Sequence, residues 1–126
     1  MPSEASPTRA ERLAWLAIQD NAHLAQGFVA DMKVEQFEAD RRTFYAVTRC
    51  LEIISEAARR LRGAQQDQNP DLEWRQIEDS GNLFRHVYQN VAESRVWMTV
   101  HDRLPALLSA AERALADTPP PAQRPK

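Results

Sequence analysis

The chain has 126 residues, of which 43% are hydrophobic, and a formal net charge of −2. This length fits one domain with a single modest core. The slightly negative charge argues against a surface coated with basic residues, so any nucleic-acid contact must be local. The single cysteine, Cys50, excludes an intramolecular disulfide and a thiolate metal cluster. No apolar run resembles a signal peptide or a membrane span, which predicts a cytoplasmic protein with no membrane partner.

Good helix formers dominate the composition, and glycine is scarce at three residues, so we expect an all-α fold. Prolines and small polar residues mark both ends of the chain. The sequence therefore predicts a folded helical domain over residues 8–117, flanked by flexible tails over residues 1–7 and 118–126.

The first helix is expected from about Thr8 to Met32. Thr8 is a suitable N-cap, and Glu11 three residues later completes a capping box. Apolar residues at alternating spacings of three and four predict one buried face. They are Trp15, Ile18, Ala22, Ala25, Val29 and Met32. The apolar surface extends beyond that face to Leu13, Leu16, Leu24 and Phe28, so this helix should have neighbours on two sides.

The second helix is expected from about Arg41 to Arg62, after a short connection that reads VEQFEAD. It has an apolar seam and a charged flank. The seam consists of Phe44, Val47, Leu51, Ile54, Ala58 and Leu61. The flank consists of Arg49, Glu52, Glu56, Arg59 and Arg60. Gly63 suits a helix C-cap, and residues 63–74 are expected to form a loop in which Pro70 blocks helix continuation.

A third helix is expected from about Trp74 to Asn90, and a fourth from about Ser94 to Ala116. The seam of the fourth helix consists of Trp97, Val100, Leu104, Leu107, Ala111 and Leu115. Pro105 interrupts that helix, because proline lacks the N–H and crowds the carbonyl four residues earlier, so we expect a kink there. Four amphipathic helices with short links predict an antiparallel, up-down four-helix bundle with a kinked last helix.

The stretch SGNLFRHVYQNV, residues 80–91, concentrates polar side chains on the third helix. A rotation of about 100° per residue places Gly81, Arg85 and Tyr88 along one face, with Asn82 and His86 along the next. A compact polar site is therefore feasible.

Four segments carry a resemblance to a known family. They are YAVTRCLEIISEAARRL (45–61), WRQIEDSGN (74–82), RHVY (85–88) and VWMTVHDRLPALL (96–108). Their order and spacing cover nearly the whole folded region. On these segments the chain is identified as a member of the HepT-like group of the HEPN superfamily. Those are small four-helix proteins that usually pair with a minimal nucleotidyltransferase in bacterial toxin–antitoxin systems.

The resemblance implies metal-independent cleavage of RNA in a cleft between the two subunits of a homodimer, with no cofactor. The family signature is an arginine, then four to six residues, then a histidine, with a tyrosine two residues further on. His86 and Tyr88 match the last two positions. His86 would act as general acid or base, since its ordinary pKa lies near neutrality. Tyr88 would be where a cognate nucleotidyltransferase antitoxin attaches AMP and silences the toxin.

The family arginine has no counterpart, because Gly81 stands where it is expected, followed by Asn82. Arg85 lies one turn after Gly81, so we expect its guanidinium to reach toward the same space, with Gly81 leaving room. An arginine there would be a catalytic cation that holds phosphate. Asn82 is a candidate supporting residue.

Two residues of the second helix are candidate RNA-contacting or supporting residues. Arg49 is a candidate phosphate contact or dimer salt bridge. Glu56 either lines the cleft or pairs with Arg60 at the favourable four-residue spacing, and the pairing is favoured. His23 and His101 are expected to be surface or helix-packing residues, and two isolated histidines do not make a metal site.

Three hypotheses for the function remain open. The leading one is a dimeric HepT-like ribonuclease toxin that acts through His86 with Arg85 as substitute cation. The alternative, favoured by the missing arginine, is a catalytically inactive interaction module that binds a nucleotidyltransferase or a nucleotide. The third is a purely structural helical homodimer.

Overall fold

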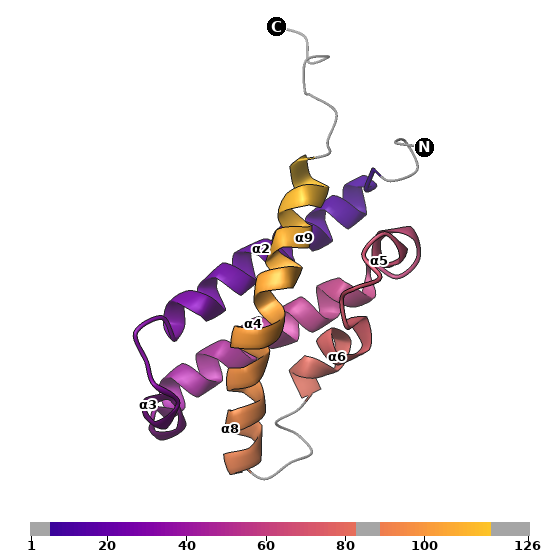
Figure 1. Cartoon of the computed structure of the whole chain (residues 1–126). Helices are drawn as coiled ribbons and strands as arrows, with labels where there is room; N and C mark the ends of the chain where they lie inside the picture. Colours follow the sequence, from indigo (N-terminus) through magenta and orange to yellow (C-terminus); the bar gives the residue numbers. More distant parts are fainter. Residues whose placement is uncertain (1–5, 83–88, 117–126) are drawn as a thin grey trace, which may run out of the picture.

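The computed structural model describes residues 6–82 and 89–116, and all regular structure within these ranges is helical (Figure 1). The elements are α2 (Arg9–Phe28), α3 (Val34–Ala39), α4 (Arg41–Arg59), α5 (Ala64–Asp67), α6 (Trp74–Asp79), the 3₁₀ helix η1 (Ser80–Asn82), α8 (Gln89–Met98), the π-helical segment η2 (Thr99–Arg103) and α9 (Leu104–Ala116). The predicted all-α bundle is confirmed. The predicted tails lie largely outside the described residues.

Helix α2 begins as its sequence predicts. The Thr8 hydroxyl accepts from the N–H of Glu11, and the Glu11 carboxylate accepts from the N–H of Thr8, which completes the capping box. The predicted extension to Met32 is wrong. After Phe28 the backbone bonds span only three residues, as in the bond from the N–H of Met32 to the Val29 carbonyl, so the chain turns.

The segment expected to be a plain connection contains the helix α3. Phe37 of α3 is completely buried, with its ring 6.0 Å from that of Phe44 and 5.5 Å from that of Trp97. The burial of this one aromatic side chain holds a six-residue helix that propensity alone would not stabilise. Asp40 then caps α4 by accepting from the N–H and the hydroxyl of Thr43, and these bonds lower its pKa.

Helix α4 ends at Arg59 and not at Arg62. The predicted seam is buried throughout, with Leu61 lying just beyond the end of the helix. Gly63 follows with a positive φ of 103°, a conformation that suits glycine, but it is the N-cap of the next helix. The C-cap of α4 is Arg60, so the expected helix C-cap at Gly63 is wrong. The expected loop contains the short helix α5. Its buried Gln65 accepts a 2.8 Å hydrogen bond from the indole N–H of Trp15 and so ties α5 to α2.

The largest difference from expectation lies in the predicted third helix. Helix α6 ends at Asp79 and is followed by the 3₁₀ turn η1, while the next described helix, α8, already begins at Gln89. The expected break between Asn90 and Ser94 is therefore wrong. The expected interruption before Pro105 is confirmed, because η2 widens the helix there and the Leu104 N–H donates to the carbonyl of Thr99.

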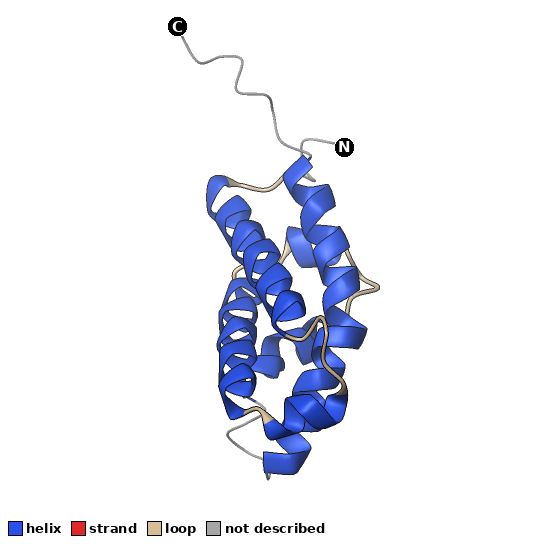
Figure 2. Ribbon diagram, turned by 90° about the vertical axis from the view of Figure 1, so that its left-hand side faces the viewer, coloured by secondary structure: helices blue, strands red, loops and turns tan. Residues whose placement is uncertain are grey.

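The long helices pack lengthwise into one bundle (Figures 1 and 2). Helix α2 lies along α4 and α9, while α6 and η1 pack against α4. The start of α2 and the end of α9 lie at the same end of the bundle (Figure 1). None of the described helices is long and apolar enough to cross a membrane. The arrangement leaves one flank of α4 facing the end of η1.

Candidate functional site

The predicted site residues are divided between described and undescribed parts of the chain. Arg85, His86 and Tyr88 lie outside the described residues, so their predicted roles stay predictions. Asn82 ends η1, immediately before that segment. Arg49 and Glu56 lie on α4, and the structure brings both to the same groove as Asn82.

This groove, which we call the α4 groove, has a volume of about 480 Å³. Its floor is the charged flank of α4, one border is Ala17 of α2, and the other is Gly81 and Asn82 of η1. The α4 residues that line it include Arg49, Glu52, Ile53, Glu56, Arg59 and Arg60. A polar groove with several guanidinium groups can receive phosphate groups.

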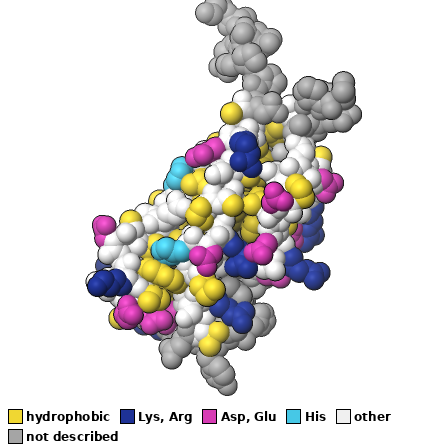
Figure 3. Space-filling view, viewed as in Figure 1, with side chains coloured by type: hydrophobic (Ala, Val, Ile, Leu, Met, Phe, Trp, Pro, Cys, Tyr) yellow, Lys and Arg dark blue, Asp and Glu magenta, His cyan; other side chains and the backbone are white. Residues whose placement is uncertain are grey.

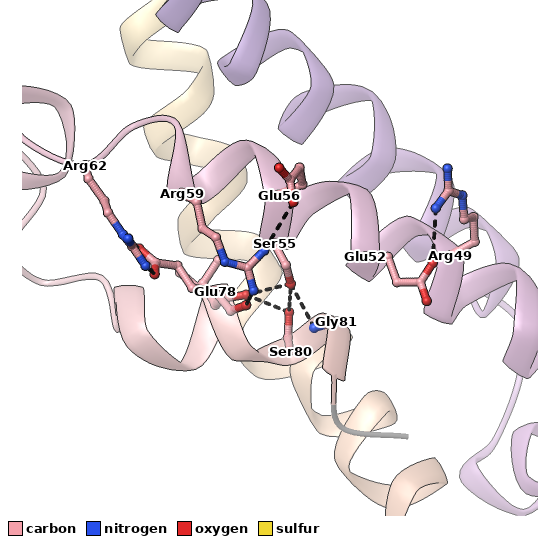
Figure 4. Close-up of polar contacts among 10 residues, drawn as sticks. Arg49, Glu52, Ser55, Glu56, Arg59, Arg62, Glu78, Ser80 and Gly81 are labelled. Atoms are coloured by element: carbon pink, nitrogen blue, oxygen red, sulfur yellow. Dashed lines mark hydrogen bonds and ion pairs between the residues drawn. The ribbon is translucent and has the colours of Figure 1, made fainter. Parts of the chain in front are cut away.

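Ion pairs organise the charges along the groove. Arg49 pairs with Glu52 at 3.1 Å, and Arg59 pairs with Glu56 at 3.4 Å (Figure 4). The expected pairing of Glu56 with Arg60 is therefore wrong. Glu56 pairs with Arg59 and not with Arg60 because the Arg59 guanidinium is also held in place by the Glu78 carbonyl, which accepts a 2.8 Å hydrogen bond from it.

The expectation that Gly81 leaves room is wrong, whereas the reach of Arg85 toward this space lies outside the described residues and stays a prediction. Gly81 is buried, and a Cβ atom there would lie 2.9 Å from the Cα of Glu52 and 2.9 Å from the Oγ of Ser55. The space that a side chain would need is filled by α4 itself. The missing family arginine therefore coincides with a close approach between η1 and the backbone of α4.

Ser55 forms the junction that holds η1 in this position (Figure 4). Its buried Oγ donates to the Ile77 carbonyl at 3.1 Å, accepts from the Gly81 N–H at 2.8 Å, and lies 3.1 Å from the Oγ of Ser80. Buried polar atoms are stable when paired in this way. Sequence reasoning missed Ser55. The only signal in the sequence was a serine directly after the seam residue Ile54, and it did not show which segment packs against Ser55.

A second junction joins α6 to the end of α4. Glu78 is 8% exposed and accepts from the guanidinium of Arg62 and, at 2.8 Å, from the amide of Gln66. The hydrogen bond from Arg62 is the main cause that lowers the pKa of Glu78, and burial opposes it. The same contact raises the pKa of Arg62. Sequence reasoning missed Glu78, because Trp74–Asp79 alone does not show which residue faces α4.

The other reactive side chains lie elsewhere. His23 is exposed, and His101 is exposed with its ring stacked 4.1 Å from that of Trp97, so the expected surface or packing roles are confirmed. Burial raises the pKa of the Cys50 thiol, which disfavours the reactive thiolate. Over residues 6–82 and 89–116, no three histidine, cysteine or acidic side chains are grouped so that they could hold a metal ion.

The fold and the groove describe a small all-helical protein with an arginine-lined surface groove. Comparison with known proteins identifies its family. Residues 18–114 match the family described as Ribonuclease HepT-like, and the chain belongs to that family. A protein of Thermococcus cleftensis named "Probable ribonuclease HepT" is 29% identical over 96 residues, which cover 76% of this chain and 87% of that protein. A protein of Methanocaldococcus jannaschii, named a "Putative RNase", is 28% identical over 90 residues, covering 71% of this chain and 78% of its own length. No solved structure gives a significant match.

Proposed function

We propose that this chain is a metal-independent RNA endonuclease and the toxin of a toxin–antitoxin pair. The observation that carries the proposal is the α4 groove, which collects Arg49, Arg59 and Arg60 beside Asn82. His86 follows Asn82 by four residues in the sequence. The family and the names of its relatives support RNA as the substrate.

The chemistry needs a proton carrier and a cation. The 2′-hydroxyl of one nucleotide attacks the adjacent phosphorus, the bond to the 5′-oxygen breaks, and that oxygen takes a proton. His86 suits both proton transfers, because imidazole titrates near neutral pH. A guanidinium stabilises the negative charge that accumulates on the phosphoryl oxygens. The products would carry a 2′,3′-cyclic phosphate and a 5′-hydroxyl group.

The outward face of α2 supports a homodimer as the active form. Leu13, Leu16, Leu24 and Phe28 are between 39% and 60% exposed. Figure 3 shows hydrophobic side chains at the surface in the region of α2 and α9, between acidic and basic ones. Ala17, which borders the α4 groove, lies one turn after Leu13. A second copy packed on this face would therefore cover apolar surface and bring two grooves near each other.

The proposed partner is a minimal nucleotidyltransferase that acts as antitoxin. Tyr88 lies two residues after His86, so an AMP group on its hydroxyl would add a negative charge close to the proposed catalytic residue. Such a charge would repel the phosphates of RNA and silence the nuclease.

Cleavage of RNA by the pure protein in a chelating buffer tests the proposed activity. We expect wild type to cleave single-stranded RNA to products with cyclic phosphate ends, and His86→Ala to be at least about a hundredfold slower, since general acid–base catalysis contributes at that scale. Arg85→Ala tests whether Arg85 is the catalytic cation, and Arg85→Lys should not restore the rate, because an ammonium lacks the two-pronged contact. Cleavage by His86→Ala at the wild-type rate would contradict the proposal.

The assembly and the modification have separate tests. Light scattering at micromolar concentration should give twice the 14.4 kDa monomer mass, and Leu24→Glu should shift the protein toward the monomer.

Incubation with the cognate nucleotidyltransferase and ATP should add one AMP mass to wild type and none to Tyr88→Phe. An unchanged intact mass, with an enzyme that is active on another substrate, would contradict the role of Tyr88.

One observation favours the inactive interaction module as a second candidate. The close packing of Gly81 against α4 leaves no room for an arginine at the position that the family uses. A folded dimer that binds the nucleotidyltransferase but leaves RNA intact would support this candidate over the ribonuclease.

A further inference from the structure

We propose that Arg60 holds a phosphate group of the RNA strand in the α4 groove. This inference deepens the proposed ribonuclease function and rests on it. It assigns a substrate contact to a residue whose expected role was only to pair with Glu56.

The charge balance of the groove points to Arg60. Three arginines line the groove and two glutamates lie among them, so one positive charge is in excess. Arg49 is paired with Glu52 and Arg59 with Glu56. No hydrogen bond or ion pair joins the Arg60 side chain to any residue of the described ranges. The excess charge of the groove is therefore the charge of Arg60.

The neighbouring arginines have structural contacts that Arg60 lacks. Arg59 donates to the Glu78 carbonyl at 2.8 Å, and Arg62 donates to both carboxylate oxygens of Glu78. Those contacts hold α6 against α4. The Arg60 side chain is exposed to solvent, so a ligand can replace water on its N–H donors. Its fork of donors matches the oxygens of a phosphate group.

The position of Arg60 also fits a strand that follows the groove. Arg60 is the C-cap of α4, and Arg49 lies eleven residues earlier, which is about three turns and roughly 16 Å along the same side of the helix. Between these two cations the groove is lined by Ile53 and Ala57, against which a sugar or base can pack. An extended single strand can thus contact one cation at each end, whereas a single free phosphate could contact only one.

Binding of a single-stranded RNA with 2′-O-methyl groups, which cannot be cleaved by 2′-hydroxyl attack, tests this proposal. Fluorescence anisotropy at several salt concentrations would compare wild type, Arg60→Ala, Arg60→Lys and the control Arg75→Ala. Arg75 is also exposed, but it lies on α6 and does not line the α4 groove. We expect Arg60→Ala to weaken binding about five- to tenfold at low salt and to lower the salt slope by about 0.7, the value for one phosphate contact on a single strand. Arg60→Lys should keep most of the affinity, since an ammonium still neutralises a phosphate.

The failures of this inference and of the proposed function can be told apart. If wild type binds and cleaves RNA while Arg60→Ala binds as tightly, Arg60 has no such role and the proposed function stands. Equal losses for Arg60→Ala and Arg75→Ala would mean attraction by general surface charge and would also overturn the proposal. If wild type neither binds nor cleaves RNA, both proposals fail. Circular dichroism checks that each variant is folded, and Arg60→Gln replaces Arg60→Ala if the alanine variant is not.

Discussion

The two longest helices, α2 and α4, both present apolar residues to the core, but their outward sides differ in chemistry. Both are amphipathic and of nearly equal length, 20 and 19 residues, and they pack along each other. The outward side of α2 is apolar, with Leu13, Leu24 and Phe28 exposed. The outward side of α4 is charged and holds the arginines of the α4 groove.

This contrast separates folding from function. Completely buried side chains such as Ile18 on α2 and Ile54 on α4 stabilise the fold. The exposed sides contribute little to folding, so they are free to suit a partner, and their chemistry differs accordingly. An apolar surface suits a second copy of the chain, whereas an arginine-containing groove suits a polyanion.

The largest expected effect on stability is that of a buried residue, and it is compared here with an exposed residue of α2. Ile54→Ala should lower the free energy of unfolding by about 2–5 kcal/mol, because it leaves a cavity in the core. Leu24→Ala, at a position that is 52% exposed, should cost less than about 1 kcal/mol in dilute protein. Urea denaturation of both variants measures the difference. A large, concentration-independent loss for Leu24→Ala would mean that the outward face of α2 is covered within the monomer.

The next effect tests the close approach of η1 to α4. Gly81→Ala should destabilise the protein by about 1–3 kcal/mol, since its Cβ would press on the backbone of Glu52. Gly81→Arg should cost at least as much and should not raise the cleavage rate. Gly27→Ala is the matched control, because nothing lies within 4 Å of a Cβ there and alanine favours a helix by up to about 1 kcal/mol. A stable, more active Gly81→Arg variant would show that the approach of η1 to α4 can open.

The smallest effect concerns the junction of α6 with the end of α4. The pKa of Glu78 lies below its ordinary value of 4.5, so this carboxylate stabilises the fold above that pH. The stabilisation is lost as the pH falls through 4.5 and then through the lower pKa of the folded state. Because the Arg62 side chain is largely exposed, Glu78→Gln should cost only about 1 kcal/mol at pH 7 and progressively less below pH 4.5. Urea denaturation at each pH measures the loss, and Glu112→Gln, at an exposed position, is the control. If Glu78→Gln lowers the free energy of unfolding equally at pH 7 and below pH 4.5, the charge of Glu78 has no such role.

Local signals in the sequence were sufficient for the elements that depend on neighbouring residues. The capping box of Thr8, the seams of α2 and α4 and the interruption before Pro105 all follow from spacing and backbone chemistry. Each involves residues that are close together in the chain, where the helical period or a fixed dihedral decides the geometry. The family could likewise be identified from the residues alone.

Only the tertiary structure decided which residues meet around the α4 groove. The sequence placed Gly81 on the face of a continuous helix, but its N–H bonds to Ser55, 26 positions earlier, and its missing side chain makes room for the backbone of α4. Likewise, Glu56 pairs with Arg59 and leaves Arg60 available, because Glu78 of α6 holds the Arg59 guanidinium through its carbonyl. Helical periodicity gives the side of a helix on which a residue lies, but it does not give the distant segment that packs there. These contacts join residues about 20 or more positions apart, so the packing of α6 and η1 on α4 determined them.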